Sequence, residues 1–107
     1  MNRFHRKLVA QGPKAACKYA LGVIRGRYYE AEETIARDPE QALLYAEAII
    51  GGRWSMAEKY IAKNHYCAGR YIHKFGEQIK NELADPNHKL TPIDAIMIKN
   101  MMAKNEI

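Results

Sequence analysis

Hydrophobic and polar positions recur along the first two thirds of the chain with a period of 26 residues. Residues 15–40 align with residues 41–66 without a gap, and ten of the 26 columns are identical. The identical pairs are Ala16/Ala42, Tyr19/Tyr45, Ala20/Ala46, Ile24/Ile50, Gly26/Gly52, Arg27/Arg53, Ala31/Ala57, Glu32/Glu58, Ile35/Ile61 and Ala36/Ala62. Self-similarity at a fixed period of this length is typical of repeats built from small helical units.

Each unit has the hydrophobic spacing of two short helices. The apolar face of the first helix contains Ala16, Tyr19, Ala20, Val23 and Ile24, and that of the second contains Tyr28, Ala31 and Ile35. Glycine favours helix ends, and it follows the first helix at Gly26 and at Gly51-Gly52. Neither helix is long enough to be stable alone, so neighbouring units must bury the apolar faces.

Residue pairs that favour a helix start recur at nearly the same spacing. They are Gly12-Pro13, Asp38-Pro39, Asn64-His65 and Thr91-Pro92, separated by 26, 26 and 27 residues. Asp, Asn and Thr accept hydrogen bonds from the free N–H groups of a first turn, and proline has no N–H to lose there. Asp94, three residues after Thr91, adds the acid of a capping box. We therefore expect a helix to start after each pair.

The third unit departs from the pattern because it lacks the Gly-Arg-aromatic turn. Its hydrophobic residues recur every four positions, at Cys67, Tyr71, Phe75, Ile79 and Leu83. This spacing predicts one long helix over 65–84 that tolerates Gly76. A last helix over 92–105 is expected to cap the stack with Ile93, Ile96, Met97, Ile98, Met101 and Met102. The first ten residues fit either a short helix or a mobile arm.

The predicted fold is all-α, with short helical-hairpin repeats stacked as a small solenoid, a longer helix in the third unit and a C-terminal capping helix. A length of 107 residues corresponds to a single domain. Its expected parts are a basic arm or short helix (1–11), repeat 1 (12–38), repeat 2 (39–64), a degenerate repeat 3 (65–90) and the capping helix (91–107).

The motif Gly-Arg-aromatic-x-x-Ala-Glu-x-x-Ile, followed by Asp-Pro in the first copy, resembles short two-helix tandem repeats of bacteriophage and other viral proteins. The residues that carry this resemblance are 19–39 and 45–64, about two fifths of the chain. The resemblance implies an all-helical repeat scaffold that comes from a mobile genetic element. It implies no catalytic residues.

Charge is distributed unevenly along the chain. There are 17 Lys plus Arg and 12 Asp plus Glu, which gives a formal net charge of +5. Residues 1–29 contain seven basic residues and no acidic residue, so residues 30–107 contain the other ten basic residues and all twelve acidic ones. The balance is therefore +7 followed by −2, and the positive charge is concentrated at the N-terminal end.

Composition excludes several classes of protein. The positive charge excludes an acidic mimic of DNA, and a hydrophobic content of 48% argues against long disorder. No apolar run approaches the roughly 20 residues that cross a bilayer, and no apolar segment follows the basic N-terminus as in a secretory signal. Two cysteines fifty positions apart do not form a disulfide scaffold, so we expect a reduced, cytoplasmic protein of the host cell.

The repeated charged residues have a structural interpretation. Arg27 with Glu32, and Arg53 with Glu58, recur at the joint between helices, where a planar guanidinium can pair bidentately with a carboxylate. We therefore predict two ion pairs. The repeated tyrosines on the apolar faces are expected in the core: Tyr19, Tyr45 and Tyr71.

No motif in the sequence predicts catalysis. A glycine-rich phosphate loop, a nucleophile elbow and a framed pair of carboxylates are all missing, so we expect neither an enzyme nor a cofactor. His65, Cys67 and His73 lack the spacing of zinc ligands, and no metal site is expected. Cys17 and Cys67 are expected to behave as small buried hydrophobic residues.

Two sets of residues are candidates for binding a partner. The first set is basic and consists of Arg3, Arg6, Lys7, Lys14, Lys18 and Arg25. The second set consists of tyrosines that align with polar residues: Tyr29 with Ser55, Tyr60 with Thr34, and Tyr66 with Glu40. The scaffold does not need an aromatic side chain at these positions, and tyrosine offers a large contact area with one polar group.

We expect a small non-enzymatic binding protein of phage or prophage type. It would dock on a host protein or protein complex that handles nucleic acid or serves defence, and inhibit or modulate it by occlusion. The alternative is direct binding of nucleic acid by the basic segment, with Tyr29 stacked on bases. A solvated tail and scattered surface tyrosines are the structural alternatives. Leu8 and Val9 offer too little apolar surface for a membrane, and the oligomeric state is left open.

Overall fold

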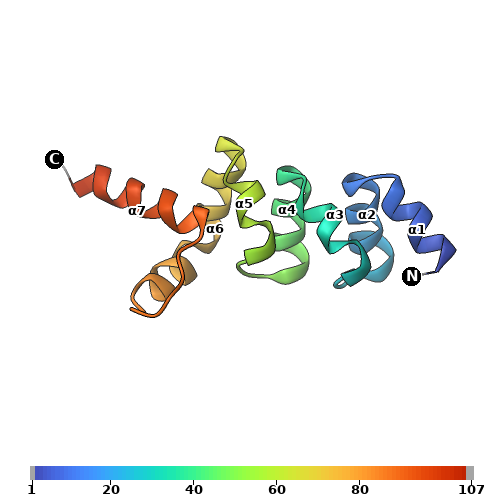
Figure 1. Cartoon of the computed structure of the whole chain (residues 1–107), viewed down its shortest axis with the longest axis horizontal. Helices are drawn as coiled ribbons and strands as arrows, with labels where there is room; N and C mark the ends of the chain where they lie inside the picture. Colours follow the sequence, from blue (N-terminus) through green and yellow to red (C-terminus); the bar gives the residue numbers. More distant parts are fainter. Residues whose placement is uncertain (1, 106–107) are drawn as a thin grey trace.

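The computed structural model describes residues 2–105, and every element of secondary structure in this range is helical (Figure 1). The α-helices are α1 (Arg3–Ala10), α2 (Pro13–Tyr19), α3 (Glu32–Ala36), α4 (Pro39–Tyr45), α5 (Ser55–Ile61), α6 (His65–Leu83) and α7 (Pro92–Asn105). Two π-helical turns, η1 (Ala20–Ile24) and η3 (Ala46–Ile50), continue α2 and α4, and a 3₁₀ turn, η2 (Tyr29–Ala31), leads into α3. The predicted all-α class is confirmed for these residues.

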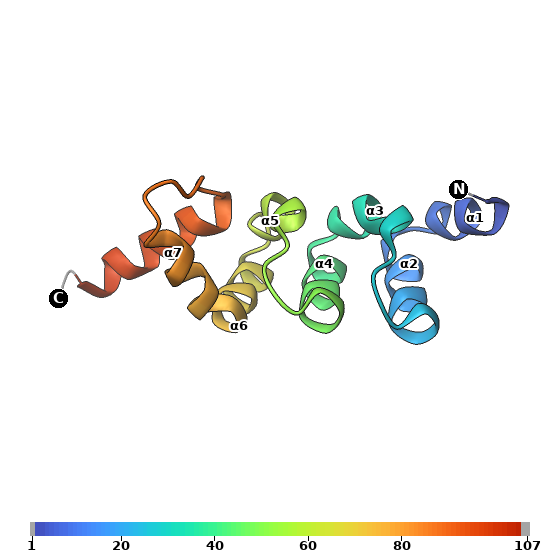
Figure 2. The same ribbon diagram turned by 90° about the horizontal axis from the view of Figure 1, so that it is seen from below.

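The helices form two layers along a molecule that measures 55 × 25 × 19 Å. Helices α2, α4 and α6 form the first layer, and α1, α3, α5 and α7 form the second (Figure 2). Helices that are consecutive in the sequence follow one another along the long axis (Figure 1). The buried residues between the layers are mostly alanines, isoleucines and aromatic residues, with Tyr28, Tyr45 and Tyr71 as the largest fully buried side chains.

Side chains at the predicted caps start α4 and α6. Asp38 Oδ1 accepts hydrogen bonds from the backbone N–H groups of Glu40 and Gln41, at 3.0 and 3.2 Å. Asn64 Oδ1 accepts one from the backbone N–H of Cys67, at 3.0 Å. Both caps satisfy N–H groups that a first helical turn leaves without a partner, as the sequence predicted.

The starts of α7 and α2 differ from each other. Thr91 Oγ1 accepts the Asp94 N–H at 3.3 Å, and Asp94 Oδ2 accepts the Thr91 N–H at 2.9 Å, which confirms the capping box. Gly12 has no side chain with which to cap α2. It adopts a φ of 108° instead, a left-handed conformation that lets the chain turn from α1 into α2.

Left-handed residues end the first helix of each of the first two units. The Arg25 N–H donates to the Ala20 carbonyl at 2.7 Å, and the Gly51 N–H donates to the Ala46 carbonyl at 2.8 Å. Their φ angles are 56° and 73°. The prediction that Gly26 ends the first of these helices is therefore wrong by one residue. Arg25 takes the conformation that glycine takes in the second unit.

We expect Arg25→Gly to raise the free energy of unfolding by about 0.5–1 kcal/mol. A left-handed conformation costs an L-residue about 1–2 kcal/mol, and the greater backbone entropy of glycine offsets about 0.5–1 kcal/mol of that gain. Urea unfolding measures the change, and Gly51→Ala is the control that should lower stability. A fall in stability for Arg25→Gly would contradict the argument.

The long helix predicted over 65–84 is present as α6, but it is bent. Phe75 has non-helical angles, with φ −110° and ψ 18°, so two helical segments meet there. Phe75 lies two residues before Glu77, which aligns with the helix-ending Gly51 of the second unit. The third unit therefore bends near the position at which the second unit stops.

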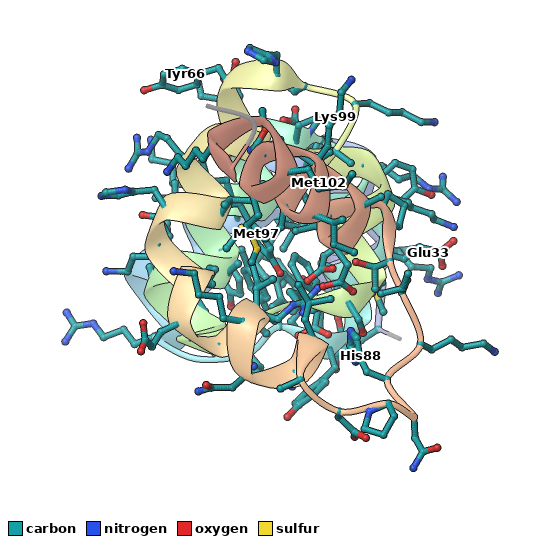
Figure 3. All side chains as sticks on the ribbon, turned by 90° about the vertical axis from the view of Figure 1, so that its left-hand side faces the viewer. Glu33, Tyr66, His88, Met97, Lys99 and Met102 are labelled. Carbon is teal, nitrogen blue, oxygen red and sulfur yellow. The ribbon has the colours of Figure 1, made fainter. Side chains whose placement is uncertain are left out.

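Only the first half of α7 covers the core. Ile93 and Met97 are buried, and Met97 points from α7 into the interior (Figure 3). Met101 and Met102 are exposed. The prediction that the Ile and Met residues of this segment together cap the stack is therefore wrong for its second half, which extends past the helices that α7 packs against (Figure 1).

Candidate functional site

Arg27 forms the first of two hydrogen-bonded joints between successive units. Its Nε and Nη2 atoms donate to the two carboxylate oxygens of Glu32, both at 2.8 Å. The Tyr45 hydroxyl donates to Glu32 Oε2 at 2.7 Å and accepts the backbone N–H of Tyr28 at 2.8 Å. The joint therefore fastens the turn before α3 to α4 in the next unit.

Arg53 forms the second joint with the same atoms, 26 residues later. Its Nε and Nη2 atoms donate to Glu58 at 2.9 and 2.7 Å. The Tyr71 hydroxyl donates to Glu58 Oε2 at 2.5 Å and accepts the backbone N–H of Trp54 at 2.7 Å. Both predicted ion pairs are confirmed, and Tyr45 and Tyr71 are core residues as expected.

The second joint is closed by further residues, whereas the first is open. Arg53 Nη1 lies 2.9 Å from Glu82 Oε2 and 2.9 Å from Asp94 Oδ1, the latter an ionic contact without the alignment of a hydrogen bond. The Thr91 hydroxyl donates to the other oxygen of the joint's glutamate at 2.5 Å. The Arg53 side chain is consequently 6% exposed, against 42% for Arg27.

Burial and hydrogen bonding act in opposite directions on the pKa of the joint carboxyls. Burial raises the pKa of Glu58, but its hydrogen bonds, that from Arg53 foremost, outweigh burial and hold the pKa below its usual 4.5. The pKa of Glu32, bonded to Arg27, and the pKa of Asp94 are lowered by the same balance. All three carboxyls are therefore ionised at neutral pH and occupied in structural contacts.

We expect stability to fall as the pH drops below about 4.5, because the pKa values of the joint carboxyls are lower in the folded chain than in the unfolded one. Their contribution is fully present above the unfolded values and is lost as the pH falls through the folded ones. Urea midpoints between about pH 7 and about pH 2 measure it. A midpoint that does not change over this range would contradict the assignment.

Helix α1 positions the basic residues of the N-terminal segment. Asn2 Oδ1 accepts the His5 N–H at 2.9 Å and caps the helix, and His5 Nδ1 lies 2.7 Å from the Tyr28 hydroxyl. Leu8 and Val9 pack partly against the core. Of the two alternatives for the first ten residues, the short helix is observed over Arg3–Ala10, and residue 1 lies outside the described residues.

All six basic candidate residues are exposed. Arg3, Arg6 and Lys7 lie on α1, Lys14 and Lys18 lie on α2, and Arg25 ends η1. Within residues 2–105, none of the six forms an ion pair. Residues 1–29 also contain no acidic side chain, so this end of the molecule carries a local excess of positive charge. These six residues are called here the basic end.

The three candidate tyrosines do not form one surface. Tyr29 is 68% exposed at the start of a second-layer helix, and the Arg27 guanidinium lies 4.7 Å from its ring centroid. Tyr60 is half-buried near the end of the next second-layer helix, with the Lys59 and Lys63 amines 5.2 and 5.9 Å from its ring centroid. Tyr66 projects outward from the start of α6 (Figure 3). The three tyrosines therefore come from three different elements, η2, α5 and α6.

The sequence analysis missed an exposed apolar strip at the N-terminal end. Val23, assigned to a buried face, is 65% exposed, and Phe4, which was given no role, is 54% exposed. Tyr19, also predicted in the core, is only half-buried. The available signal was position in the sequence, because within residues 2–105 only the short helix α1 precedes the first unit.

The described residues offer little for metal or thiol chemistry. Residues 2–105 contain no group of three or more His, Cys, Asp or Glu side chains placed to hold a metal ion. Burial, with a smaller effect from Asp38, raises the pKa of Cys17 to about 11, and burial also raises the pKa of Cys67. Both thiols are buried, as predicted, and stay protonated at neutral pH.

The molecule was also compared with known proteins and with the dimensions of a membrane. No protein-family model, curated protein or solved structure matches the chain. Among the described helices, none combines the length and the apolar character needed to span a bilayer.

Proposed function

We propose that this chain is a non-enzymatic binding protein, a short α-solenoid of the phage two-helix repeat type, that docks on a host protein complex through its basic end. The complex is proposed to be one that handles nucleic acid or serves defence, and docking would inhibit or modulate it by occlusion. One observation carries the proposal, namely that six exposed basic side chains lie on α1, on α2 and at the end of η1, in a segment that contains no acidic residue.

The charged residues fall into two groups with different roles, and this difference supports the proposal. The conspicuous repeated charges, Arg27 with Glu32 and Arg53 with Glu58, are occupied in the joints. The basic residues of the basic end take no part in the joints, and they lie on or directly after helices rather than on a mobile tail. Fixed positive side chains attract and orient an acidic protein surface, mainly by raising the association rate.

Direct binding of nucleic acid remains the second candidate, because phosphates suit the same basic end. The exposed ring of Tyr29 favours it, since aromatic rings stack on unpaired bases. The Arg27 guanidinium already lies over that ring, which leaves one face for a base. The protein partner is preferred because exposed apolar side chains, Phe4 and Val23, lie at the same end.

Capture from host lysate, with nuclease treatment and mass-spectrometric identification, tests the proposal. We expect wild-type protein to retain a discrete host protein after nuclease treatment. Combined Arg3→Ala, Arg6→Ala and Lys7→Ala should lose it. The matched control removes three exposed charges elsewhere (Lys63→Ala, Lys74→Ala and Lys99→Ala) and should keep it.

Nucleic-acid binding predicts the opposite pattern. Generic DNA or RNA would then bind with an affinity that falls steeply with salt, and captured proteins would disappear after nuclease treatment. That result would overturn the proposed protein partner. An oligonucleotide that causes no shift at low salt would remove the second candidate.

A further inference from the structure

The position occupied by Val23 becomes progressively more buried along the stack. Its equivalents 26 and 52 residues later are Ile49 and Phe75. Val23 is 65% exposed, Ile49 is partly buried against the core, and Phe75 is 7% exposed. In the second unit, η3 lies against η1 of the first, whereas only α1, a second-layer helix, precedes α2 and η1 within residues 2–105. Val23 therefore lacks the covering neighbours that bury its equivalents.

An apolar strip extends from Val23 to α1. The rings of Phe4 and Tyr19 lie with centroids 5.5 Å apart, and Val23 lies one turn beyond Tyr19 on the same helix face. The aligned Tyr45 is fully buried, whereas Tyr19 is half-buried. We call Phe4, Tyr19 and Val23 the end strip. Its exposed apolar side chains can contact the apolar face of one helix.

Basic side chains flank the end strip. Arg3 and Lys7 lie one before and three after Phe4 on α1, and Arg25 lies two residues after Val23. All three are exposed. An occupant of the strip therefore needs acidic residues beside its apolar ones, because like charges across an interface are strongly unfavourable.

The charge of the strip's surroundings also disfavours a second copy of this chain. The exposed second half of α7 is the other apolar end of the molecule, with Met101 and Met102. Residues 95–105 carry Lys99 and Lys104 and no acidic residue. End-to-end stacking would therefore place positive charge against the basic end.

We propose that the end strip binds an acidic amphipathic helix of the partner protein, laid beside α2 and in contact with α1. This inference rests on the proposed function and names the element of the partner that the basic end recognises. Apolar residues of the helix contact Val23 and Phe4, and its carboxylates pair with the flanking Arg3, Lys7 and Arg25. Repeat stacks are completed in the same way when neighbouring helices cover an apolar face.

A synthetic peptide tests the inference without the host partner. The probe is an amphipathic helix of about four turns with leucines on one face and glutamates on the other. We expect it to bind wild-type protein in a calorimetric titration, and to shift the amide resonances of residues 20–25. A polyglutamate peptide of equal charge is the control for charge alone, and it should bind at least about tenfold more weakly.

Two matched variants locate the binding. Phe4→Ser with Val23→Ser should weaken peptide binding by at least about tenfold, whereas Leu90→Ser, which alters an exposed apolar residue elsewhere, should leave it unchanged. Because Phe4, Val23 and Leu90 are exposed, we expect all three substitutions to leave the fold intact. The helical content measured by circular dichroism checks this. Equal affinity of the double variant and the wild type, or of polyglutamate and the amphipathic peptide, would overturn the inference.

Two further outcomes separate this inference from the proposed function. In the first outcome, the Phe4→Ser, Val23→Ser variant still retains the host protein, whereas the triple basic variant loses it. That outcome would overturn the proposal that the end strip binds a helix and leave the docking function intact. A wild-type self-association that this double variant abolishes would show that a second copy occupies the strip, which also overturns the inference.

Discussion

Replacement of Glu58 by glutamine is expected to cost about 3–5 kcal/mol of unfolding free energy, the range found when one member of a buried ion pair is removed. The Glu58 side chain is 0% exposed, and its oxygens accept hydrogen bonds from Arg53, Tyr71 and Thr91. Glutamine keeps the shape but leaves the buried guanidinium with less compensating charge. Since small domains are stable by only about 5–15 kcal/mol, we expect a large fall in the urea midpoint.

The chain contains its own control for this substitution. Glu32→Gln removes the equivalent carboxylate from the first joint, where the Arg27 side chain is 42% exposed and water can solvate it. We expect a loss of about 2 kcal/mol there, near that of a hydrogen bond to a charged group. Equal losses for the two variants, or a larger loss for Glu32→Gln, would show that closure of the second joint does not determine its contribution.

Removal of single hydroxyls from the repeated tyrosines is expected to give the next largest effects. Tyr71→Phe leaves the buried Trp54 N–H without its acceptor and takes one donor from Glu58. An unsatisfied buried group costs about 1–3 kcal/mol, so we expect a loss of about 2–4 kcal/mol in unfolding free energy. Tyr45→Phe, which removes the same two bonds from the first joint, should lose a similar amount.

The third tyrosine of the series supplies the reference for thermal or urea unfolding. Within residues 2–105, the Tyr19 hydroxyl makes no hydrogen bond, and its side chain is half-buried. Tyr19→Phe should therefore change stability by no more than about 0.5 kcal/mol. A loss at Tyr19 as large as at Tyr45 and Tyr71 would mean that ring packing, not the hydroxyl bridge, governs all three positions.

The sequence predicted the parts of the fold that repeat. A side chain that keeps its identity 26 residues later makes the same contact twice, so the pairing of Arg27 with Glu32 and of Arg53 with Glu58 could be inferred without coordinates. The caps were predictable for a different reason, because Asp38 and Asn64 act on backbone groups only two or three residues away. Local chemistry and periodicity were sufficient in both cases.

Features that depend on an end of the stack or on distant contacts could not be predicted in this way. The period assigns Val23 to a buried face, yet Val23 is 65% exposed in the first unit, whereas the equivalent Phe75 of the third unit is 7% exposed. The hydroxyls of Tyr45 and Tyr71 reach backbone groups 17 residues upstream, for which the sequence has no local signal. The left-handed Arg25 was missed because glycine, the residue that usually takes this conformation, stands next to it.

The two joints and the basic end have complementary roles in this account. The joints fix each unit against the next and use the carboxylates of Glu32 and Glu58 for that purpose. The contact of His5 with Tyr28 holds α1, so the backbone that carries Arg3, Arg6 and Lys7 is ordered before a partner binds. Pre-organisation of this kind lowers the entropy lost on binding.

Site-specific photocrosslinking in host lysate measures most directly whether the basic end is the docking surface. A photoreactive residue would replace Lys7 or Lys18 at the basic end, and Lys63 or Lys99 at exposed control positions. The account predicts a discrete, nuclease-resistant protein adduct from Lys7 and Lys18 and none from the two controls. Adducts from Lys63 or Lys99 alone, or adducts with nucleic acid alone, would contradict it.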